Sequence, residues 1–340
     1  MIKKMTVSEV VKAFALVFVF IALFVFFSIR NPYFLSFDNV MEILRQISFI
    51  GIIAVGMTMT LLTGGLDLSV GSNVALAVVV SALIMDMMPI GGTVNMGNAV
   101  LGCIIGVLCS VGVGLLNGVL VNVVNIPPLI ATLGTMEIIR GLVYTLTNAI
   151  PVYKGIPAGF RFIGQGTVGP LPFPVVVLAL TFIVGGIILA KTIYGRHIYC
   201  VGGNEEVARL SGINVKKIKY SVFMISGMLA GIAGILLLSR MNSGQPRTAI
   251  GYEMEVITAC VLGGVSIAGG EGKLWNVFFG VLIIGTLGYG LISIGLNEFV
   301  QMMVKGIVLI IAVGLDTVSR KRKQNLNELR RTEGLSIDPA

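Results

Sequence analysis

The chain has 340 residues, of which 56% are hydrophobic and only 12% are charged, and its formal net charge is +8. Soluble domains carry about 25% charged residues, so this composition excludes a soluble globular protein. A hydrocarbon core about 30 Å thick is crossed by a helix of about 20 apolar residues. We therefore expect an all-α polytopic membrane protein, with membrane lipid around much of its surface.

Ten apolar spans follow one another along the chain. If the basic N-terminus lies in the cytoplasm, ten crossings return the C-terminus to the same side, where the basic loop 191–219 also lies. The first span is long and lacks a cleavage site, so we predict a retained anchor rather than a signal peptide. We expect a transmembrane domain at 1–318 and a polar cytoplasmic tail at 319–340. The predicted spans are about 13–29, 48–63, 70–88, 99–124, 129–147, 174–190, 220–239, 254–270, 276–295 and 300–318.

The basic residues support this orientation. Fifteen of the 24 Lys and Arg residues lie in three segments, 3–12, 191–219 and 320–331. Such clustering is typical of cytoplasmic loops, so we do not expect nucleic acid as a partner. The four cysteines and the single histidine form no CxxC or Cys/His cluster, and we therefore predict no metal site and no disulfide framework.

Glycine is abundant, with 44 residues, and the GxxxG spacing occurs at 102–106, 114–118 and 227–231. This spacing allows membrane helices to approach one another closely. Two further stretches, "TGGLDLSVGS" (63–72) and "LGGVSIAGGEG" (262–272), share a GG-x5-G spacing where apolar runs break. They are either an internal repeat, of the kind that points to the transport path in many carriers, or a coincidence.

Asp67 lies in the first break, beside Ser69 and Ser72. Ionisable groups inside a membrane often mark a transport path, which makes Asp67 a candidate path residue. Its carboxylate can also cap the next helix by accepting the N–H of Val70 or Gly71. We favour capping as its immediate role.

Uncharged polar residues follow in the fourth and fifth spans. Asn117 and Asn122 lie in "LLNGVLVNVVN", and Thr132 and Thr135 come after the Pro127–Pro128 turn. These hydrogen-bonding groups suit the passage of a neutral polyhydroxyl solute, and they serve equally well as contacts between helices.

Glu137 and Arg140 have the i,i+3 spacing that allows two side chains to pair on one helix face. The pair is either a self-neutralised structural contact, which we favour, or part of the pore lining. Both residues join the candidate translocation path.

The stretch "GGNEEVARLSGI" (202–213) predicts a short capped helix in the cytoplasmic loop. Asn204 is the expected N-cap, Glu205 and Glu206 lie at the positive end of the helix dipole, and Arg209 can pair with Glu205 at i,i+4. Gly212 supplies a left-handed stop. Isolated helices of about two turns are marginal in water, so this helix needs support from elsewhere.

No catalytic motif is present. "AGGEGKL" (268–274) fails the GxxxxGK[ST] pattern because Ile267 and Leu274 stand at required positions. HExxH and GxSxG are absent as well. We assign no catalytic residue, predict that the chain is not an enzyme, and expect any nucleotide chemistry on another chain.

Four stretches together resemble one family: "TGGLDLSVGS", "PPLIATLGTMEIIRGL", "GRHIYCVGGNEEVARLSGINV" and "YEMEVITACVLGGVSIAGGEGKLWNVFFGVLI". Over about residues 40–315 the chain looks like the membrane permease of bacterial ABC sugar importers of the ribose, xylose and galactose type. The resemblance implies a multi-pass protein of the bacterial cytoplasmic (inner) membrane that carries a sugar or sugar-like neutral solute inward.

The resemblance also implies partners. It places the coupling helix at Asn204–Gly212, docked on an ATP-binding subunit that is often made of two fused nucleotide-binding halves and that holds ATP and Mg. An extracytoplasmic sugar-binding protein and a second permease copy or paralogue complete the expected transporter. The predicted contact residues of the coupling helix are Val207, Ala208, Leu210 and Ile213, with Glu205, Glu206 and Arg209 at the rim.

Three alternatives stay open. Permeases for branched-chain amino acids or nucleosides have related patterns, although the lack of an obvious intramembrane charge for a zwitterion favours a neutral solute. A stand-alone ion-coupled carrier is disfavoured by the scarcity of titratable groups in the spans. A membrane enzyme lacks a catalytic set. The sequence leaves the identity of the sugar open.

Overall fold

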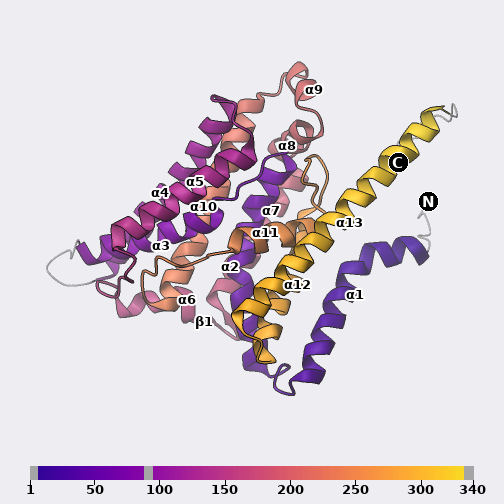
Figure 1. Ribbon diagram of the computed structural model, residues 1–340. Helices are drawn as coiled ribbons and strands as arrows, with labels where there is room; N and C mark the ends of the chain where they lie inside the picture. The colour runs from indigo at the N-terminus through magenta and orange to yellow at the C-terminus, as the bar shows by residue number, and fades with distance from the viewer. Residues whose placement is uncertain (1–6, 88–94, 333–340) are drawn as a thin grey trace.

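The computed structural model describes residues 7–87 and 95–332 and consists almost entirely of helices (Figure 1). Within these described ranges, seven helices are long and apolar enough to cross a membrane, and helix α1 contains a shorter apolar stretch at Leu16–Arg30. This confirms an all-α polytopic membrane protein. The long helices are α1 Val7–Arg30, α2 Phe37–Leu62, α3 Val70–Met87, α4 Met96–Asn122, α5 Pro128–Thr147, α7 Phe173–Lys191, α10 Val215–Met241, α12 Leu274–Ser293 and α13 Glu298–Thr332.

Short elements connect these helices. Between α5 and α7 the chain forms the 3-10 helix η2 (Ala158–Arg161), the single turn α6 (Phe162–Gln165) and a small antiparallel hairpin of β1 (Thr167–Val168) and β2 (Leu171–Pro172). Two short helices, α8 (Ile193–Gly203) and α9 (Glu205–Leu210), lead into α10, and α11 covers Tyr252–Leu262. The short elements before α7, which include α6 and β1, cover one end of the bundle, and α9 lies at the other end (Figure 1).

Helix α10 is the centre of the bundle and packs against α2, α3 and α4. Glycine makes the closest approach possible: a Cβ on Gly114 of α4 would overlap the Phe223 carbonyl oxygen of α10, and one on Gly227 of α10 would overlap the Ser110 carbonyl oxygen of α4. The predicted role of the GxxxG pairs is therefore confirmed at this interface. It fixes the α4–α10 spacing on which the buried polar site depends.

Nine of the ten predicted spans correspond to long helices, and the eighth is wrong. Instead of a helix over 254–270, α11 ends at Leu262 after 11 residues, about 16 Å at 1.5 Å per residue. Gly264 has φ +78° and its N–H donates to the Val261 carbonyl oxygen at 2.8 Å, which stops the helix. Hydropathy misses this stop because the residues after it remain apolar.

Both ends of the described chain lie toward the same end of the bundle as α9 (Figure 1). This is the arrangement that an even number of crossings requires, because the chain from the end of α10 through α11 to Gly270 also crosses the bundle: the Gly270 N–H bonds the Leu62 carbonyl oxygen at the end of α2. The assignment of this end to the cytoplasm rests on the basic segments. Helix α13 continues to Thr332, so the predicted boundary between membrane domain and tail at residue 318 falls inside a helix.

Candidate functional site

Helix α9 has the caps that the sequence predicts. The Asn204 side-chain oxygen accepts the N–H groups of Glu206 and Val207, both at 3.0 Å. Gly212 has φ +81°, and the Ile213 N–H returns to the Ala208 carbonyl oxygen at 3.1 Å. Both ends of this two-turn helix are therefore closed by hydrogen bonds of its own sequence.

Contacts with the bundle supply the support that α9 needs. Ala208 is only 2% exposed, so its methyl group faces the protein. The Glu205 carboxylate lies 2.6 Å from the Lys219 ammonium of α10. The expected Glu205–Arg209 pair is wrong, because Glu205 turns toward α10 and Arg209 lies instead 3.7 Å from Glu206.

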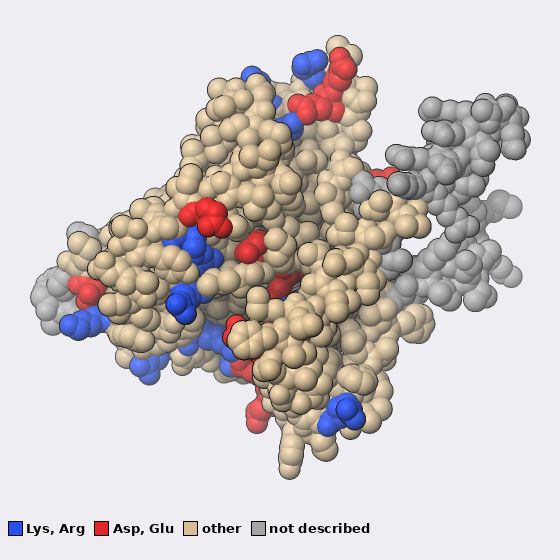
Figure 2. Space-filling view, in the orientation of Figure 1, with Lys and Arg blue, Asp and Glu red and all other residues tan. Residues whose placement is uncertain are grey.

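The outer face of α9 carries apolar side chains among charged ones. Val207 is 56% exposed and Leu210 is 79% exposed. Figure 2 shows acidic and basic side chains gathered at this tip, whereas much of the surface below is uncharged. Ala208 is buried and Ile213 is half-buried against the core, so we revise their predicted contact role to that of anchors.

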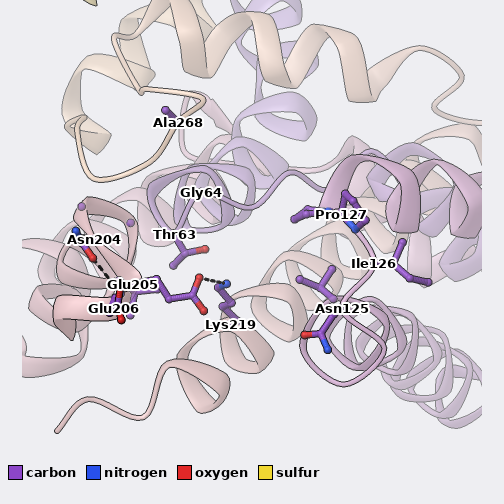
Figure 3. A pocket seen from close by; sticks show the side chains of 15 residues that line it. Thr63, Gly64, Asn125, Ile126, Pro127, Asn204, Glu205, Glu206, Lys219 and Ala268 are labelled. Carbon is purple, nitrogen blue, oxygen red and sulfur yellow. Dashed lines mark hydrogen bonds and ion pairs between the residues drawn. The ribbon is translucent and has the colours of Figure 1, made fainter. Parts of the chain in front are cut away.

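A cavity of about 620 Å³ lies beneath α9 (Figure 3). Its walls are the start of α9, the end of α2 at Thr63–Gly64, the α4–α5 turn at Asn125–Pro128, and Ala268 of the α11–α12 loop. The Glu205–Lys219 ion pair lies along one side of it. The helix thus lies over a space bordered by five separate parts of the chain.

Helix α8 is tied to the same loop by a hydrogen bond. The Tyr199 hydroxyl donates to the Gly272 carbonyl oxygen at 2.8 Å. Burial raises the pKa of the Tyr199 phenol, so it keeps the proton that it donates. The α8–α9 segment is therefore attached both to α10 and to the α11–α12 loop.

A second group of predicted residues forms a buried polar cluster around Asp67. One carboxylate oxygen accepts the Ser69 hydroxyl at 2.6 Å, the Ser69 N–H at 3.1 Å and the Asn117 amide at 3.3 Å. The other accepts the Ser226 hydroxyl at 2.8 Å. The predicted cap through Val70 or Gly71 is wrong, because the carboxylate turns back to Ser69 and inward to α4 and α10.

The other uncharged candidates are also buried. Thr132 of α5 donates to the Leu66 carbonyl oxygen at 3.1 Å and to Pro128 in its own helix. Asn122 and Thr135 donate to carbonyl oxygens within their helices. The Thr132 hydroxyl connects α5 to the chain before α3, whereas the other two side chains bond only carbonyl oxygens of their own helices. All three side chains are buried in the bundle and do not lie on an open face.

Arg140 and Glu137 do not pair. The Arg140 guanidinium donates to the carbonyl oxygens of Thr248 at 2.9 Å and Pro246 at 3.2 Å, and among the described residues no ion pair joins it to Glu137. The chain between α10 and α11 lacks helical hydrogen bonds, and backbone groups at membrane depth must be satisfied. Arg140 meets that need, so the predicted pair is wrong.

Glu137 is left exposed near the middle of α5. The opposite face of the helix is buried through Ala131, Thr135 and Ile139. Gly134 and Gly141 flank Glu137 on its face, and a Cβ on either would meet nothing within 4 Å. A carboxylate at this depth is too costly to face lipid, so this face requires a polar environment.

Sequence reasoning missed Lys219 and Ser226. Lys219 follows Glu205 by 14 residues, and Ser226 lies 159 residues after Asp67, so no local pattern connects either pair. Within residues 7–87 and 95–332, no group of three His, Cys, Asp or Glu side chains has the geometry of a metal site.

The sequence comparisons agree with this architecture. A family described as "Branched-chain amino acid transport system / permease component" matches residues 39–313. The ribose import permease protein RbsC of Bacillus subtilis is 42% identical over 290 residues, which cover 85% of this chain and 88% of that protein. RbsC of Escherichia coli is 39% identical, with the same coverage of both chains.

A pentose permease of another name is equally similar. The L-arabinose transport system permease protein AraH of Escherichia coli is 40% identical over 314 residues, covering 92% of this chain and 93% of that protein. No solved structure matches the chain significantly. The matched segment runs from α2 into α13 and includes α9, the cavity and the buried polar cluster.

Proposed function

The chain belongs to the family of branched-chain amino acid transport system permease components, and we propose that it is the membrane subunit of an ATP-driven importer of a sugar or sugar-like neutral solute. The observation that carries this proposal is the near full-length similarity to permeases named for ribose and L-arabinose import. The sugar itself stays open between pentoses and related neutral solutes.

An ATP-binding subunit is the proposed partner of α9. Exposed apolar side chains surrounded by charges, here Val207 and Leu210, have the composition of a docking surface. The sequence contains no phosphate-binding motif of its own, so ATP and Mg belong to that partner. We propose that the partner consists of two fused nucleotide-binding halves, which is the arrangement implied by the resemblance described above.

The remaining partners follow from the same architecture. We propose that the end of the bundle opposite α9, where the β1–β2 hairpin lies, receives an extracytoplasmic sugar-binding protein. A second permease copy or paralogue completes the path in the bacterial inner membrane. Substrate choice then resides mainly in the binding protein, and this chain needs no tight sugar site.

We propose that the α5 face with Glu137 borders the translocation path between the two permease copies. A polar path gives the Glu137 carboxylate the environment that it needs, and the open flanks at Gly134 and Gly141 leave room for a solute. The buried residues Asp67 and Asn117 support the scaffold behind this face.

A branched-chain amino acid is the second candidate, because the family description names it. Its carboxylate would need a free cation at membrane depth. The basic side chains in the interior of the described spans are already engaged: Arg140 by backbone carbonyls, Lys305 by Glu255, and Arg45 and Arg240 by Glu42. This favours a neutral solute.

Uptake by the reconstituted transporter tests the proposal. The solute is first identified by a thermal-shift screen of the partner binding protein against pentoses, hexoses, polyols and leucine. Radiolabelled uptake into proteoliposomes is then measured with and without ATP. We expect ATP-dependent accumulation of a sugar and none of leucine. Uptake driven by an ion gradient without ATP, or ATP-dependent leucine uptake, contradicts the proposal.

A further inference from the structure

Three backbones meet beside the cavity, where the last turn of α8, the end of α2 and the α11–α12 loop come together. The Gly270 N–H donates a hydrogen bond to the Leu62 carbonyl oxygen at 2.9 Å. Gly202 of α8 packs directly on this bond: a Cβ there would overlap the Leu62 oxygen and lie 2.6 Å from the Gly270 nitrogen. Real Cβ atoms essentially never come closer than 3.0 Å, so only glycine fits at position 202.

The loop side of this contact is equally close. A Cβ on Gly270 would lie 2.8 Å from the Gly203 Cα, and one on Gly269 would lie 2.7 Å from the Gly64 nitrogen and 3.0 Å from the Gly202 oxygen. We call Gly64, Gly202, Gly269 and Gly270, together with Leu62, the glycine junction. Close-packed atoms transmit a displacement, and contacts between backbones have no side-chain rotamers to absorb it.

Helix α9 is connected to the junction by two residues, Gly203 and Asn204. Asn204 follows Gly203 and caps the first turn of α9, so the helix and the junction share a continuous, hydrogen-bonded backbone. Tyr199, one turn earlier in α8, holds the same loop through the Gly272 carbonyl. A shift of α9 therefore reaches the junction by a short path.

The other two sides of the junction lead into the membrane. Leu62 is the last residue of α2, and the break that follows it carries Asp67, which binds Asn117 of α4 and Ser226 of α10. Gly270 belongs to the loop that enters α12. The glycine-containing breaks after α2 and after α11 thus both contact the last turn of α8, and they contact it at the same place.

We propose that the glycine junction transmits movements of α9 to the breaks of the membrane bundle, with Gly202 as the positioning residue on which coupling depends. The role rests on the proposed function, because an ATPase moves α9 only in an ATP-driven transporter. Gly202 does not contact solute or nucleotide; it sets how closely α8 sits on the Leu62–Gly270 hydrogen bond.

Two neighbouring substitutions test this role. Gly202→Ala inserts a methyl group into the junction, whereas Gly203→Ala places one where nothing lies within 4 Å. Both positions are in the last turn of α8, so the change in helix propensity is shared. In the reconstituted complex, we would measure sugar uptake per ATP hydrolysed, together with co-purification of the ATP-binding subunit.

We expect Gly202→Ala to lower uptake per ATP about tenfold or more while basal ATP hydrolysis and co-purification persist, and Gly203→Ala to match the wild type within about twofold. Equal coupling in the two variants overturns the proposal. If Gly202→Ala does not assemble, Tyr199→Phe decides, because it removes only the hydroxyl that holds Gly272: uptake per ATP should fall about threefold, and unchanged coupling overturns the proposal.

The wild-type complex separates this inference from the proposed function. A wild-type complex that hydrolyses ATP but imports none of the sugars contradicts the proposed function. A wild-type complex that imports sugar, beside a Gly202→Ala complex that imports it equally well per ATP, contradicts the junction alone.

Discussion

The two breaks that follow α2 and α11 begin with the same turn and are then held in different ways. After α2, the N–H groups of Gly64 and Gly65 return to the carbonyl oxygens of Leu61 and Thr60 at 2.9 and 3.0 Å. After α11, the Gly264 N–H donates to the Val261 carbonyl oxygen at 2.8 Å, and the Val265 N–H donates to the carbonyl oxygen of Cys260 at 3.0 Å. The donors and acceptors are three and five residues apart, as they are in the first break.

The equivalence of these two turns shows which residues of the GG-x5-G stretches correspond in the structure. Gly64 and Gly264 are the residues with positive φ, at +73° and +78°, so they correspond to each other in the structure. The GG-x5-G match instead aligns Gly64 with Gly263. The two breaks therefore resemble each other in the way that the preceding helix ends. The GG-x5-G alignment of the sequence is shifted by one residue from this structural equivalence.

Beyond the turn, the first break is held through its own side chains, and the second break is held through its own backbone N–H and carbonyl groups. Asp67 ties the first break to α4 and α10. The second has three more glycines at positive φ, at 269, 270 and 272, and is held by hydrogen bonds to Leu62 and Tyr199. The buried Asp67 carboxyl group thus holds the first break, whereas the second break contacts α8 through its own backbone groups.

The largest expected effect comes from Asp67→Ala, which removes the lock of the first break. The hydroxyl groups of Ser69 and Ser226 lose their acceptor, and each buried unsatisfied group costs about 1–3 kcal/mol. We expect a loss of about 3 kcal/mol in stability, seen as a lower midpoint of thermal aggregation for the detergent-solubilised protein. Asp86→Ala, at an exposed position near the end of α3, is the control; equal midpoints for the two variants would show that the Asp67 cluster contributes nothing.

An intermediate effect is expected from the two helix stops, and it should be the same in both breaks. Gly64→Ala and Gly264→Ala each force an L side chain into the left-handed region, which costs about 1–2 kcal/mol. Neither new Cβ would come closer than 3.5 Å to another atom, so the cost is conformational. Gly112→Ala, in α4 with open space around it, is the matched control. Clearly different midpoints for the 64 and 264 variants would refute the structural equivalence.

The smallest effect is expected from Thr132→Val, which removes the hydrogen bond from α5 to the Leu66 carbonyl in the first break. A single hydrogen bond of this kind contributes about 1 kcal/mol, and valine keeps the volume of threonine. Thr145→Val is the control, because the Thr145 hydroxyl binds only a carbonyl of its own helix on an exposed face. If Thr145→Val lowers the thermal midpoint as much as Thr132→Val does, the hydrogen bond between Thr132 and the first break does not stabilise the protein.

Local patterns in the sequence were enough to predict individual elements. The caps at Asn204 and Gly212 lie within ten residues of each other and are confirmed, as is the close helix packing at Gly114 and Gly227. The candidate path residues were harder, because polarity alone does not separate a lining group from a satisfied one. Asp67 and Arg140 are both engaged inside the bundle, whereas Glu137 is exposed.

The sequence by itself determined the class of protein, the positions of nine long helices and the capped helix α9, because apolar runs, basic segments and caps are written in neighbouring residues. Only the tertiary structure decided that Glu205 pairs with Lys219, that Arg140 holds the chain before α11, and that α11 crosses only part of the bundle. The glycine junction belongs to the same group. Leu62, Gly202 and Gly270 are separated by more than 60 residues along the chain, and their contact exists only because the folded helices bring three backbones to one place.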